Sequence, residues 1–259
     1  MPLCVLCFFK FFSKTKIYLH EQNSVLGKVN SFFVPFVNKV FLNFDDTLKL
    51  NHKYKLKSFR VGLPSNHMIN YKNRKIIVKD TIINKLFICG GSQGAINLNK
   101  KILHLLSQLP QYLLNKFQIS IQCPVNQIKE IKEYLEKIST PYELKSFFVN
   151  FEEKLYETDL LISRAGAGTI NDVILTQTPT IFIPLPSSTN QHQFYNANYL
   201  NNKNAAVIIA ENELNSNESM LIIKKFISEI EPRSNLIKNL QKINIFDTNQ
   251  LIYKHLHEI

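Results

Sequence analysis

The sequence predicts an α/β protein built around a parallel β-sheet, and two observations support this fold class. Short apolar strand patterns recur from about residue 84 and alternate with helix patterns. Glycine-rich turns follow two of these strands, as is common where a strand of a parallel sheet leads into a helix. Such alternation favours right-handed crossovers and a sheet covered on both faces, so we predict one doubly wound, Rossmann-like domain at 84–245.

The elements of this domain follow in order. The strands are predicted at 85–90, 117–123, 142–147, 159–163, 180–184 and 205–210. The first helix carries one apolar stripe, formed by Ala95, Leu98, Ile102, Leu105, Leu106 and Leu109, and ends at Pro110. Further helices are predicted at 126–138, 169–176, 190–202 and 219–230.

The rest of the chain is less regular. Three strand patterns at 16–21, 38–44 and 57–64 suit part of a second α/β domain, which we place at 1–70. Three strands with few helices are too little to close a sheet. A polar, basic stretch at 71–83 is expected to be a linker, and a helix at 246–259 is expected to pack back on the N-terminal part.

The net positive charge of the chain comes entirely from its first third. Residues 1–85 hold 15 basic and 4 acidic residues, whereas 86–259 hold 16 of each. This excess favours anionic partners such as phospholipid surfaces or pyrophosphates, although an AT-rich genome would also enrich lysine. No zinc-finger, RNA-recognition or basic-region pattern occurs, so we predict no nucleic-acid partner.

The cysteines, the histidines and the apolar start of the chain give no chemical signal. Cys4 and Cys7 have no second ligand pair, so we interpret them as buried thiols of a reducing compartment, and we expect no metal site. Residues 2–12 lack a basic region before them and a small-residue cleavage site after them. They therefore favour a buried or surface-lying helix over a signal peptide, and no stretch is long enough to span a membrane.

The first glycine-rich turn is "CGGSQGA" at 89–95. Gly90 and Gly91 permit a tight turn, Gly94 is expected to open the helix, and Ser92 adds a hydroxyl. A helix N-terminus at this point would direct free amides at an anion, which predicts a phosphate site. A purely structural strand-to-helix turn is the alternative.

The second turn lies in "SRAGAGTINDV" at 163–173. Gly166 and Gly168 leave the backbone bare, and Thr169 is expected to cap the following helix. Asp172 is then well placed to accept both hydroxyls of a ribose, although acidic residues favour helix N-termini in any case. In a third segment, 184–197, His192 and Gln193 lie at a helix start, where they can reach ligand hydroxyls or remain ordinary surface residues.

Five stretches in this order resemble the MurG-type transferases of glycosyltransferase family 28. They are "HEQNSVLGKVN" (20–30), "VGLP" (61–64), "CGGSQGAINLN" (89–99), "FEEKLYETDLLISRAGAGTINDV" (151–173) and "IPLPSSTNQHQFYNA" (183–197). The resemblance implies the two-domain GT-B fold, with a complete C-terminal domain and a truncated N-terminal one. It also implies an inverting enzyme without metal or cofactor, which moves N-acetylglucosamine from UDP-GlcNAc to lipid I, forming lipid II for peptidoglycan.

The resemblance also implies roles for individual residues. Ser92 and the amides around Gly91 and Gln93 would hold the diphosphate, and the backbone at Phe148 would face the uracil. Asp172 stands where the family has a ribose-binding glutamate. The diphosphate and sugar would be lined by Ala167, Gly168 and Thr169, and the sugar hydroxyls bound by His192, Gln193 and, from the other domain, Asn23.

The sequence departs from the family in two places. The family's opening GGTGGH loop, which carries a candidate catalytic histidine, has no counterpart before His20, so the catalytic residue stays unassigned. The family's GNP-x-R appears as "GLPSN", with Leu63 and Asn66 in place of the asparagine and the arginine. An asparagine cannot supply the charged fork of an arginine.

These departures leave two functions open. The first is the full transferase, impaired by truncation and active at the cytoplasmic face of the bacterial plasma membrane. There the basic first third and the apolar residues Phe8, Phe9, Phe11 and Phe12 would help it to meet its lipid acceptor. The second is a non-catalytic UDP-sugar-binding half of a split or decaying enzyme, whose partner is a missing N-terminal half.

Overall fold

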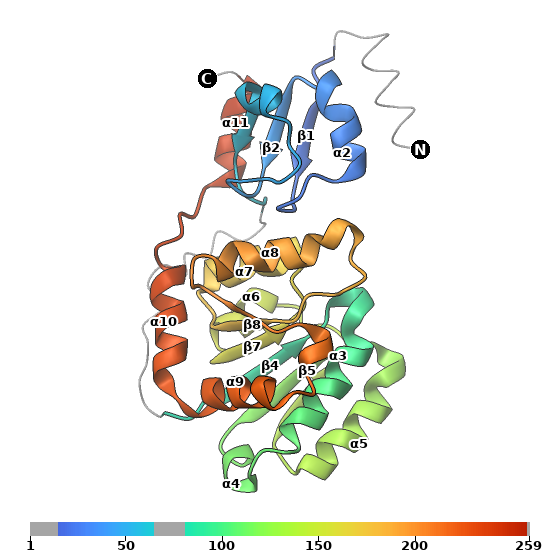
Figure 1. Cartoon of the computed structure of the whole chain (residues 1–259), viewed down its shortest axis with the longest axis vertical. Coiled ribbons are helices and arrows are strands. Elements are labelled where there is room, and N and C mark those ends of the chain that lie inside the picture. The colour runs from blue at the N-terminus through green and yellow to red at the C-terminus, as the bar shows by residue number, and fades with distance from the viewer. Residues whose placement is uncertain (1–14, 65–80, 258–259) are drawn as a thin grey trace. The chain divides into compact units, whose positions relative to one another are not determined.

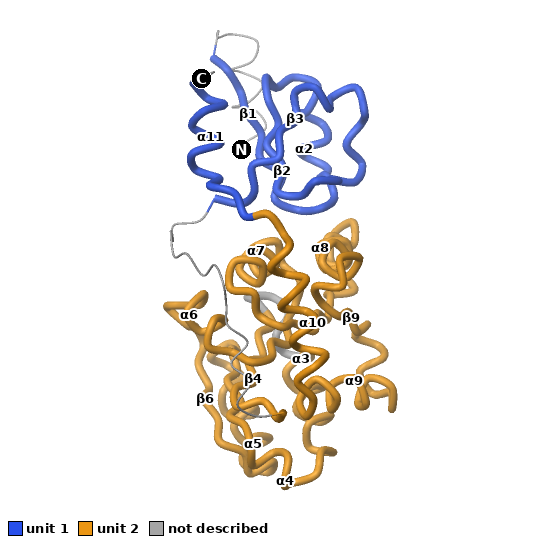
Figure 2. The backbone as a smooth tube through the Cα atoms, turned by 90° about the vertical axis from the view of Figure 1, so that its left-hand side faces the viewer, with its two compact units in different colours: residues 1–69, 245–259 blue, residues 70–244 orange. Residues whose placement is uncertain are grey.

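The computed structural model describes residues 15–64 and 81–257, with the side chains of 91–96 excepted. Contacts divide the chain into two compact units, which Figure 2 colours separately. Unit 1 comprises 1–69 and 245–259, and unit 2 comprises 70–244. The expectations for Cys4, Cys7, residues 2–12, Asn66 and most of the linker fall outside the described residues.

Unit 1 contains a three-stranded parallel sheet in the order β1-β2-β3. Its strands are β1 (Tyr18–Glu21), β2 (Lys39–Leu42) and β3 (Ser58–Arg60). The short helix α2 (Lys28–Phe33) and the 3₁₀ turn η1 (Val34–Phe36) connect β1 to β2, and η2 (His52–Lys57) connects β2 to β3. The sequence patterns marked all three strands but did not indicate α2.

The C-terminal helix α11 (Thr248–His257) completes unit 1 (Figure 2). The His255 ring lies 4.2 Å from that of Phe59 and 5.7 Å from that of Phe41, and the Lys39 ammonium donates to the His255 carbonyl. Burial, with a smaller effect of the Lys39 charge, lowers the pKa of His255.

The bend after β3 requires a glycine. Gly62 has φ +87°, and a Cβ at this position would lie 2.7 Å from Thr248 Oγ1. Any larger residue would therefore be strained and would also push against the start of α11. Its carbonyl accepts a hydrogen bond from His20 Nε2 at 2.8 Å, which ties the bend to β1.

Unit 2 contains a six-stranded, all-parallel sheet in the order β6-β5-β4-β7-β8-β9. The strands are β4 (Lys85–Cys89), β5 (Gln118–Gln122), β6 (Tyr142–Lys145), β7 (Leu160–Ser163), β8 (Thr180–Phe182) and β9 (Val207–Ile208). All six were predicted, although β9 is much shorter than its apolar run. The prediction of a parallel α/β fold is confirmed.

Helices cover both faces of this sheet (Figure 1). One layer contains α3 (Gly91–Leu106) and α5 (Ile128–Ile138), which pack together, with α4 (Gln111–Leu114) and α9 (Asn217–Ser228) nearby. The other contains α6 (Phe151–Tyr156), α7 (Ala167–Thr176) and α8 (His192–Asn201), each in contact with the next. The helix α10 (Ile230–Leu240) follows and packs on α9.

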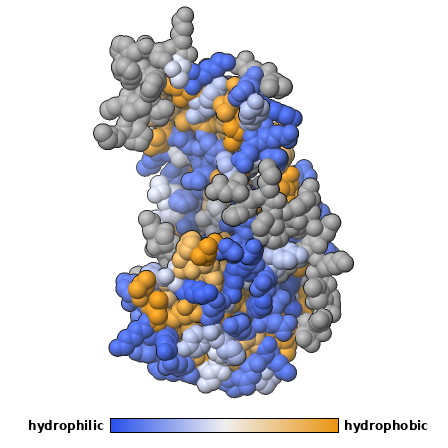
Figure 3. Space-filling model, turned by 180° about the vertical axis from the view of Figure 1, so that it is seen from behind, coloured by the Kyte–Doolittle hydropathy of each residue, from blue (hydrophilic) through white to orange (hydrophobic). Residues whose placement is uncertain are grey.

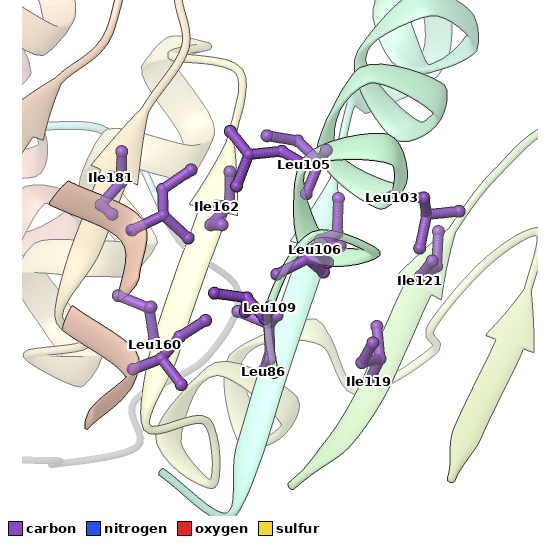
Figure 4. Close-up of a cluster of buried hydrophobic side chains, with 14 of the residues drawn as sticks. Leu86, Leu103, Leu105, Leu106, Leu109, Ile119, Ile121, Leu160, Ile162 and Ile181 are labelled. Atoms are coloured by element: carbon purple, nitrogen blue, oxygen red, sulfur yellow. The ribbon is translucent and has the colours of Figure 1, made fainter. Parts of the chain in front are cut away.

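The core of unit 2 lies between α3 and the middle strands (Figure 4). Leu105, Leu106 and Leu109, from α3 and the turn after it, face the aliphatic side chains of β4, β5, β7 and β8. These three leucines belong to the apolar stripe that the sequence predicts for this helix. On the surface, Figure 3 shows apolar residues in small groups among hydrophilic ones.

Truncation of this core is expected to destabilise unit 2. Leu106 is fully buried, so Leu106→Ala should lower the free energy of unfolding by about 2–5 kcal/mol, through lost burial and the cavity left behind. Denaturant unfolding measures this change. Leu221→Ala is the matched control, because Leu221 is 64% exposed and its truncation should alter stability little.

Candidate functional site

The candidate site follows from the strand order of unit 2. The chain leaves β4 toward β5 on one side and leaves β7 toward β8 on the other, so the connections after these two neighbouring strands diverge. A crevice forms at such a point, beyond the carboxyl ends of the strands, and it is the usual ligand site of open α/β sheets. Both predicted glycine-rich turns lie there.

The first turn places a helix N-terminus directly after β4. Gly90 is the residue before the helix, and α3 begins at Gly91 rather than at Gly94 as predicted. The side chains of Ser92 and Gln93 lie outside the described part of the structure. The backbone alone provides the amides of the first turn, which have no partner within a helix and attract anions.

The second turn leaves open space beside bare backbone. Gly166 precedes α7, which begins at Ala167, and a Cβ at Gly168 would meet no atom within 4 Å. A Cβ at Gly166 would meet only Thr169 Oγ1, at 3.8 Å. Neither glycine has a positive φ, so neither backbone conformation nor packing within the protein explains these glycines.

One prediction for this turn is wrong. Thr169 does not cap α7, because the helix has already begun at Ala167 and its N-cap, Gly166, has no side chain to accept a hydrogen bond. Thr169 is instead the third residue of the helix. The amides at the start of α7 therefore have no side-chain cap and remain available to a ligand.

Asp172 lies just beyond this first turn and has an unusual environment. It is partly exposed, and within the described residues its carboxylate has no hydrogen-bond or ion-pair partner. Burial, reinforced by the nearby negative charge of Glu152 on α6, raises its pKa to about 7. An acid without a partner in such a place can accept hydrogen bonds from a ligand.

The third segment follows β8 and leads into α8. His192 and Gln193 open this helix, as predicted, after two residues, Asn190 and Gln191, with left-handed backbone. Gln193 Oε1 accepts the Leu185 amide at 2.9 Å, and His192 Nδ1 lies 2.7 Å from the Thr189 carbonyl. The Gln193 amide nitrogen has no hydrogen-bond partner among the described residues, and its orientation is fixed by the Leu185 contact.

Phe148 follows β6 and has its side chain inside the protein. Its ring is buried, lies 5.0 Å from the Phe87 ring, and is approached by the ammonium groups of Lys145 and Lys154 at 5.4 and 5.3 Å. These contacts fix the position of the residue. The buried ring itself is therefore not exposed to a ligand.

Comparison with known proteins identifies the family. The glycosyltransferase family 28 C-terminal domain matches residues 85–246. The UDP-N-acetylglucosamine–N-acetylmuramyl-(pentapeptide) pyrophosphoryl-undecaprenol N-acetylglucosamine transferase of Rickettsia bellii is 32% identical over 251 residues, which cover 93% of this chain and 68% of the relative. The chain belongs to glycosyltransferase family 28.

Two further similarities agree with family 28. The transferase of the same name from Rickettsia felis is 36% identical, with 84% of this chain and 62% of the relative covered. The crystal structure of Acinetobacter baumannii MurG superposes with a TM-score of 0.76 at 21% identity, over 95% of this chain and 68% of that one. The chain thus spans about two thirds of the length of these relatives and has the fold of a MurG-like, GT-B glycosyltransferase.

Asn23 is the one candidate residue of this family 28 chain that belongs to unit 1. It lies beside Glu21, a fully buried carboxylate that the sequence did not mark. Glu21 accepts hydrogen bonds from the amides of Asn23 (3.0 Å) and Gly27 (2.8 Å) and from the Asn30 side chain (2.8 Å). Glu21 of the "HEQN" stretch thus fixes the conformation of this loop, which includes Asn23.

The sequence also missed a buried charged group behind the second glycine turn. Arg164 is only 5% exposed and ion-pairs at 2.8 Å with Glu211, the first residue of η5 (Glu211–Glu213). An arginine directly after a fully apolar strand was the available signal, since a buried guanidinium needs an acidic partner.

The described residues contain no helix long and apolar enough to cross a membrane. Within the same part of the chain, no group of three or more histidine, cysteine or acidic residues is arranged to hold a metal ion.

The raised pKa of Asp172 predicts a stability effect with a defined sign. The folded state holds the proton up to about pH 7, whereas the unfolded state loses it near pH 4, so ionisation costs folding free energy that grows between these values and is complete above pH 7. Asp172→Asn should therefore raise the melting temperature at pH 8 by about 2–4 °C for each kcal/mol of this cost removed.

The same substitution should change the melting temperature little at pH 4.5, where most of the cost is absent. Glu133→Gln, an exposed position on α5, is the control and should show no such difference between the two pH values. An Asp172→Asn protein that melts at or below the wild-type temperature at pH 8 would show that the carboxylate is stabilised by the fold.

Proposed function

We propose that unit 2 binds UDP-N-acetylglucosamine. We further propose that the chain serves the transfer of N-acetylglucosamine to undecaprenyl-pyrophosphoryl-MurNAc-pentapeptide, lipid I, which yields lipid II for peptidoglycan. The names of the Rickettsia relatives state this transferase activity. Family membership supports a UDP-sugar donor, and the site described above supplies groups for each part of it.

The observation that carries this proposal is the unfilled space at the second glycine turn. Gly166 and Gly168 lie beyond the carboxyl end of β7, which pairs with β4, and nothing in the fold itself requires them to lack side chains. A ligand that lies flat against the backbone does require it. The sugar and diphosphate of a nucleotide sugar fit this role.

The nucleoside would be held by backbone and by one carboxylate. The backbone at Phe148 would bind the uracil, as the position of its buried ring allows. Asp172 would accept hydrogen bonds from the ribose hydroxyls, which gives its otherwise unpartnered carboxylate a function.

The diphosphate would lie between two helix N-termini. Gly91, Ser92 and Gln93 begin α3, while Ala167, Gly168 and Thr169 begin α7. Their first-turn amides can donate to phosphate oxygens, and both helix dipoles favour negative charge there. The same groups would stabilise the UDP leaving group as charge develops on it, with neither a metal nor another cofactor required.

The sugar would meet the third segment. The Gln193 amide nitrogen would donate to a hydroxyl of N-acetylglucosamine, with His192 beside it. The acceptor hydroxyl of lipid I would then form a bond to the anomeric carbon as the bond to UDP breaks, with inversion. The base that takes the hydroxyl proton is not assigned.

Turnover distinguishes the proposed transferase from a donor-binding protein. Binding of UDP-GlcNAc without transfer to a lipid I analogue would identify the second of these.

Because the acceptor is a lipid, we place the reaction at the cytoplasmic face of the plasma membrane. Exposed side chains of unit 1 support this location. Leu56 is 96% exposed and lies among Lys53, Lys55 and Lys57, while Val29 and Phe32 on α2 are each 57% exposed. Apolar side chains flanked by lysines suit an anionic lipid surface.

Donor affinity should depend on the protonation of Asp172. A carboxylate accepts ribose hydroxyls better than its protonated form, so calorimetry should show UDP-GlcNAc affinity falling by about tenfold or more from pH 8 to pH 5.5. Asp172→Asn should bind weakly at both pH values. Undiminished affinity of Asp172→Asn at pH 8 would remove Asp172 from the site.

Gln193 allows the sugar contact to be tested without disturbing its loop. Gln193→Glu keeps an oxygen for the Leu185 amide but removes the N–H donors, so UDP-GlcNAc should bind about 3–10-fold more weakly while uridine binds as before. Equal losses for both ligands would show that Gln193 supports the loop and does not contact the sugar.

A further inference from the structure

Three charged side chains connect the two helices that begin at the crevice. Lys101 on α3 lies 3.2 Å from Glu211 Oε1, and Glu211 Oε2 lies 2.8 Å from Arg164, which directly follows β7. We call Lys101, Glu211 and Arg164 the charge bridge. Its members come from three elements that are far apart in sequence.

Arg164 fixes the turn before α7 from several sides. Its side chain donates to the carbonyls of Ile183 (3.1 Å) and Pro184 (3.3 Å), just after β8, and its backbone amide donates to the Cys89 carbonyl (3.2 Å) at the end of β4. The turn after β7 is thereby joined to the ends of both neighbouring strands.

Glu211 is the centre of the charge bridge. Burial opposes its ionisation, but the hydrogen bonds and charges of Arg164 and Lys101 outweigh this effect and lower its pKa. The carboxylate is therefore charged at neutral pH, and each of its oxygens has its own cation. One anion between two cations gives the charge bridge itself a net positive charge.

We propose that the charge bridge positions the N-termini of α3 and α7 relative to each other and so sets the affinity for the diphosphate of the donor. Arg164, Glu211 and Lys101 act as positioning residues in this account. This inference rests on the proposed function, because it assigns the two helix N-termini to the diphosphate.

Three considerations connect the charge bridge to phosphate binding. A helix is stiff along its axis. The contact of Lys101 in α3 therefore also constrains the first turn of this helix, which begins at Gly91. Phosphate oxygens that bind two helix N-termini at once need a fixed spacing between them. The net positive charge of the bridge also favours an anionic ligand, whereas a neutral nucleoside gains nothing from it.

The experiment compares UDP with uridine by calorimetry on the full chain. Lys101→Met removes the outer cation and leaves the buried Arg164–Glu211 pair intact, so the protein should fold. We expect the Kd of UDP to rise about three- to tenfold and the Kd of uridine to change less than about twofold. Lys101→Arg, which keeps the charge, should restore UDP binding to within about twofold of wild type.

The chain offers a matched control one residue away. Lys100 on the same helix pairs at 2.6 Å with Glu130 of α5, which is not a member of the charge bridge, and both side chains are partly exposed. Lys100→Met removes the same charge from α3 but leaves the bridge untouched. Its UDP affinity should stay within about twofold of wild type.

Each outcome has a defined meaning. Equal losses of UDP and uridine affinity in Lys101→Met, or no loss of either, would overturn the charge bridge as a positioning device for the diphosphate. An equal loss of UDP affinity in Lys100→Met would reduce the effect to helix charge alone and would also overturn it. Failure of the wild-type chain to bind either ligand would instead reject the proposed function.

Discussion

The parallel pairing of β4 with β7 is the contact on which the site depends. It places residues 86–89 beside 160–163, so that both strands end at the same level of the sheet. The two connections that follow run to opposite sides, and this divergence alone brings two helix N-termini to one crevice. The groups assigned to the donor in unit 2 follow the ends of these two strands, of β8 or of β6.

Two carboxylates of unit 2 lie in opposite electrostatic environments. Glu211 forms ion pairs with both Arg164 and Lys101, and its pKa is lowered. Asp172 has no partner among the described residues, and its pKa is raised. The first arrangement is typical of a group that holds structure, and the second of a group whose partner arrives from solution. This contrast supports the roles proposed for the two residues and does not depend on family membership.

Much of the fold and part of the site could be predicted from local patterns. The six strands of unit 2 are short apolar runs, and the stripe on α3 repeats with the helical period, so each was visible within a few residues. Bare glycines next to a strand end also indicated the crevice. The exact helix starts were not predicted, because Gly91 and Ala167 begin helices through backbone geometry, for which Gly94 and Thr169 looked equally suitable.

The features that could not be predicted depend on residues far apart in the chain. Glu211 is 47 positions from Arg164 and 110 from Lys101, and no periodicity links them. Glu21 serves its own loop within nine residues, yet its role emerges only when four donors converge on two oxygens. Burial of a charge is a property of the assembled fold and not of the local sequence.

The return of α11 to unit 1 has a consequence for the order of folding during synthesis. Unit 1 draws on both 1–69 and 245–259, while unit 2 is one continuous segment between them. Unit 2 can therefore assemble while the chain is still being translated, whereas unit 1 must wait until Thr248 leaves the ribosome and can contact Gly62. Within this chain, the strands of unit 1 are thus synthesised before unit 2, but unit 1 is completed after it.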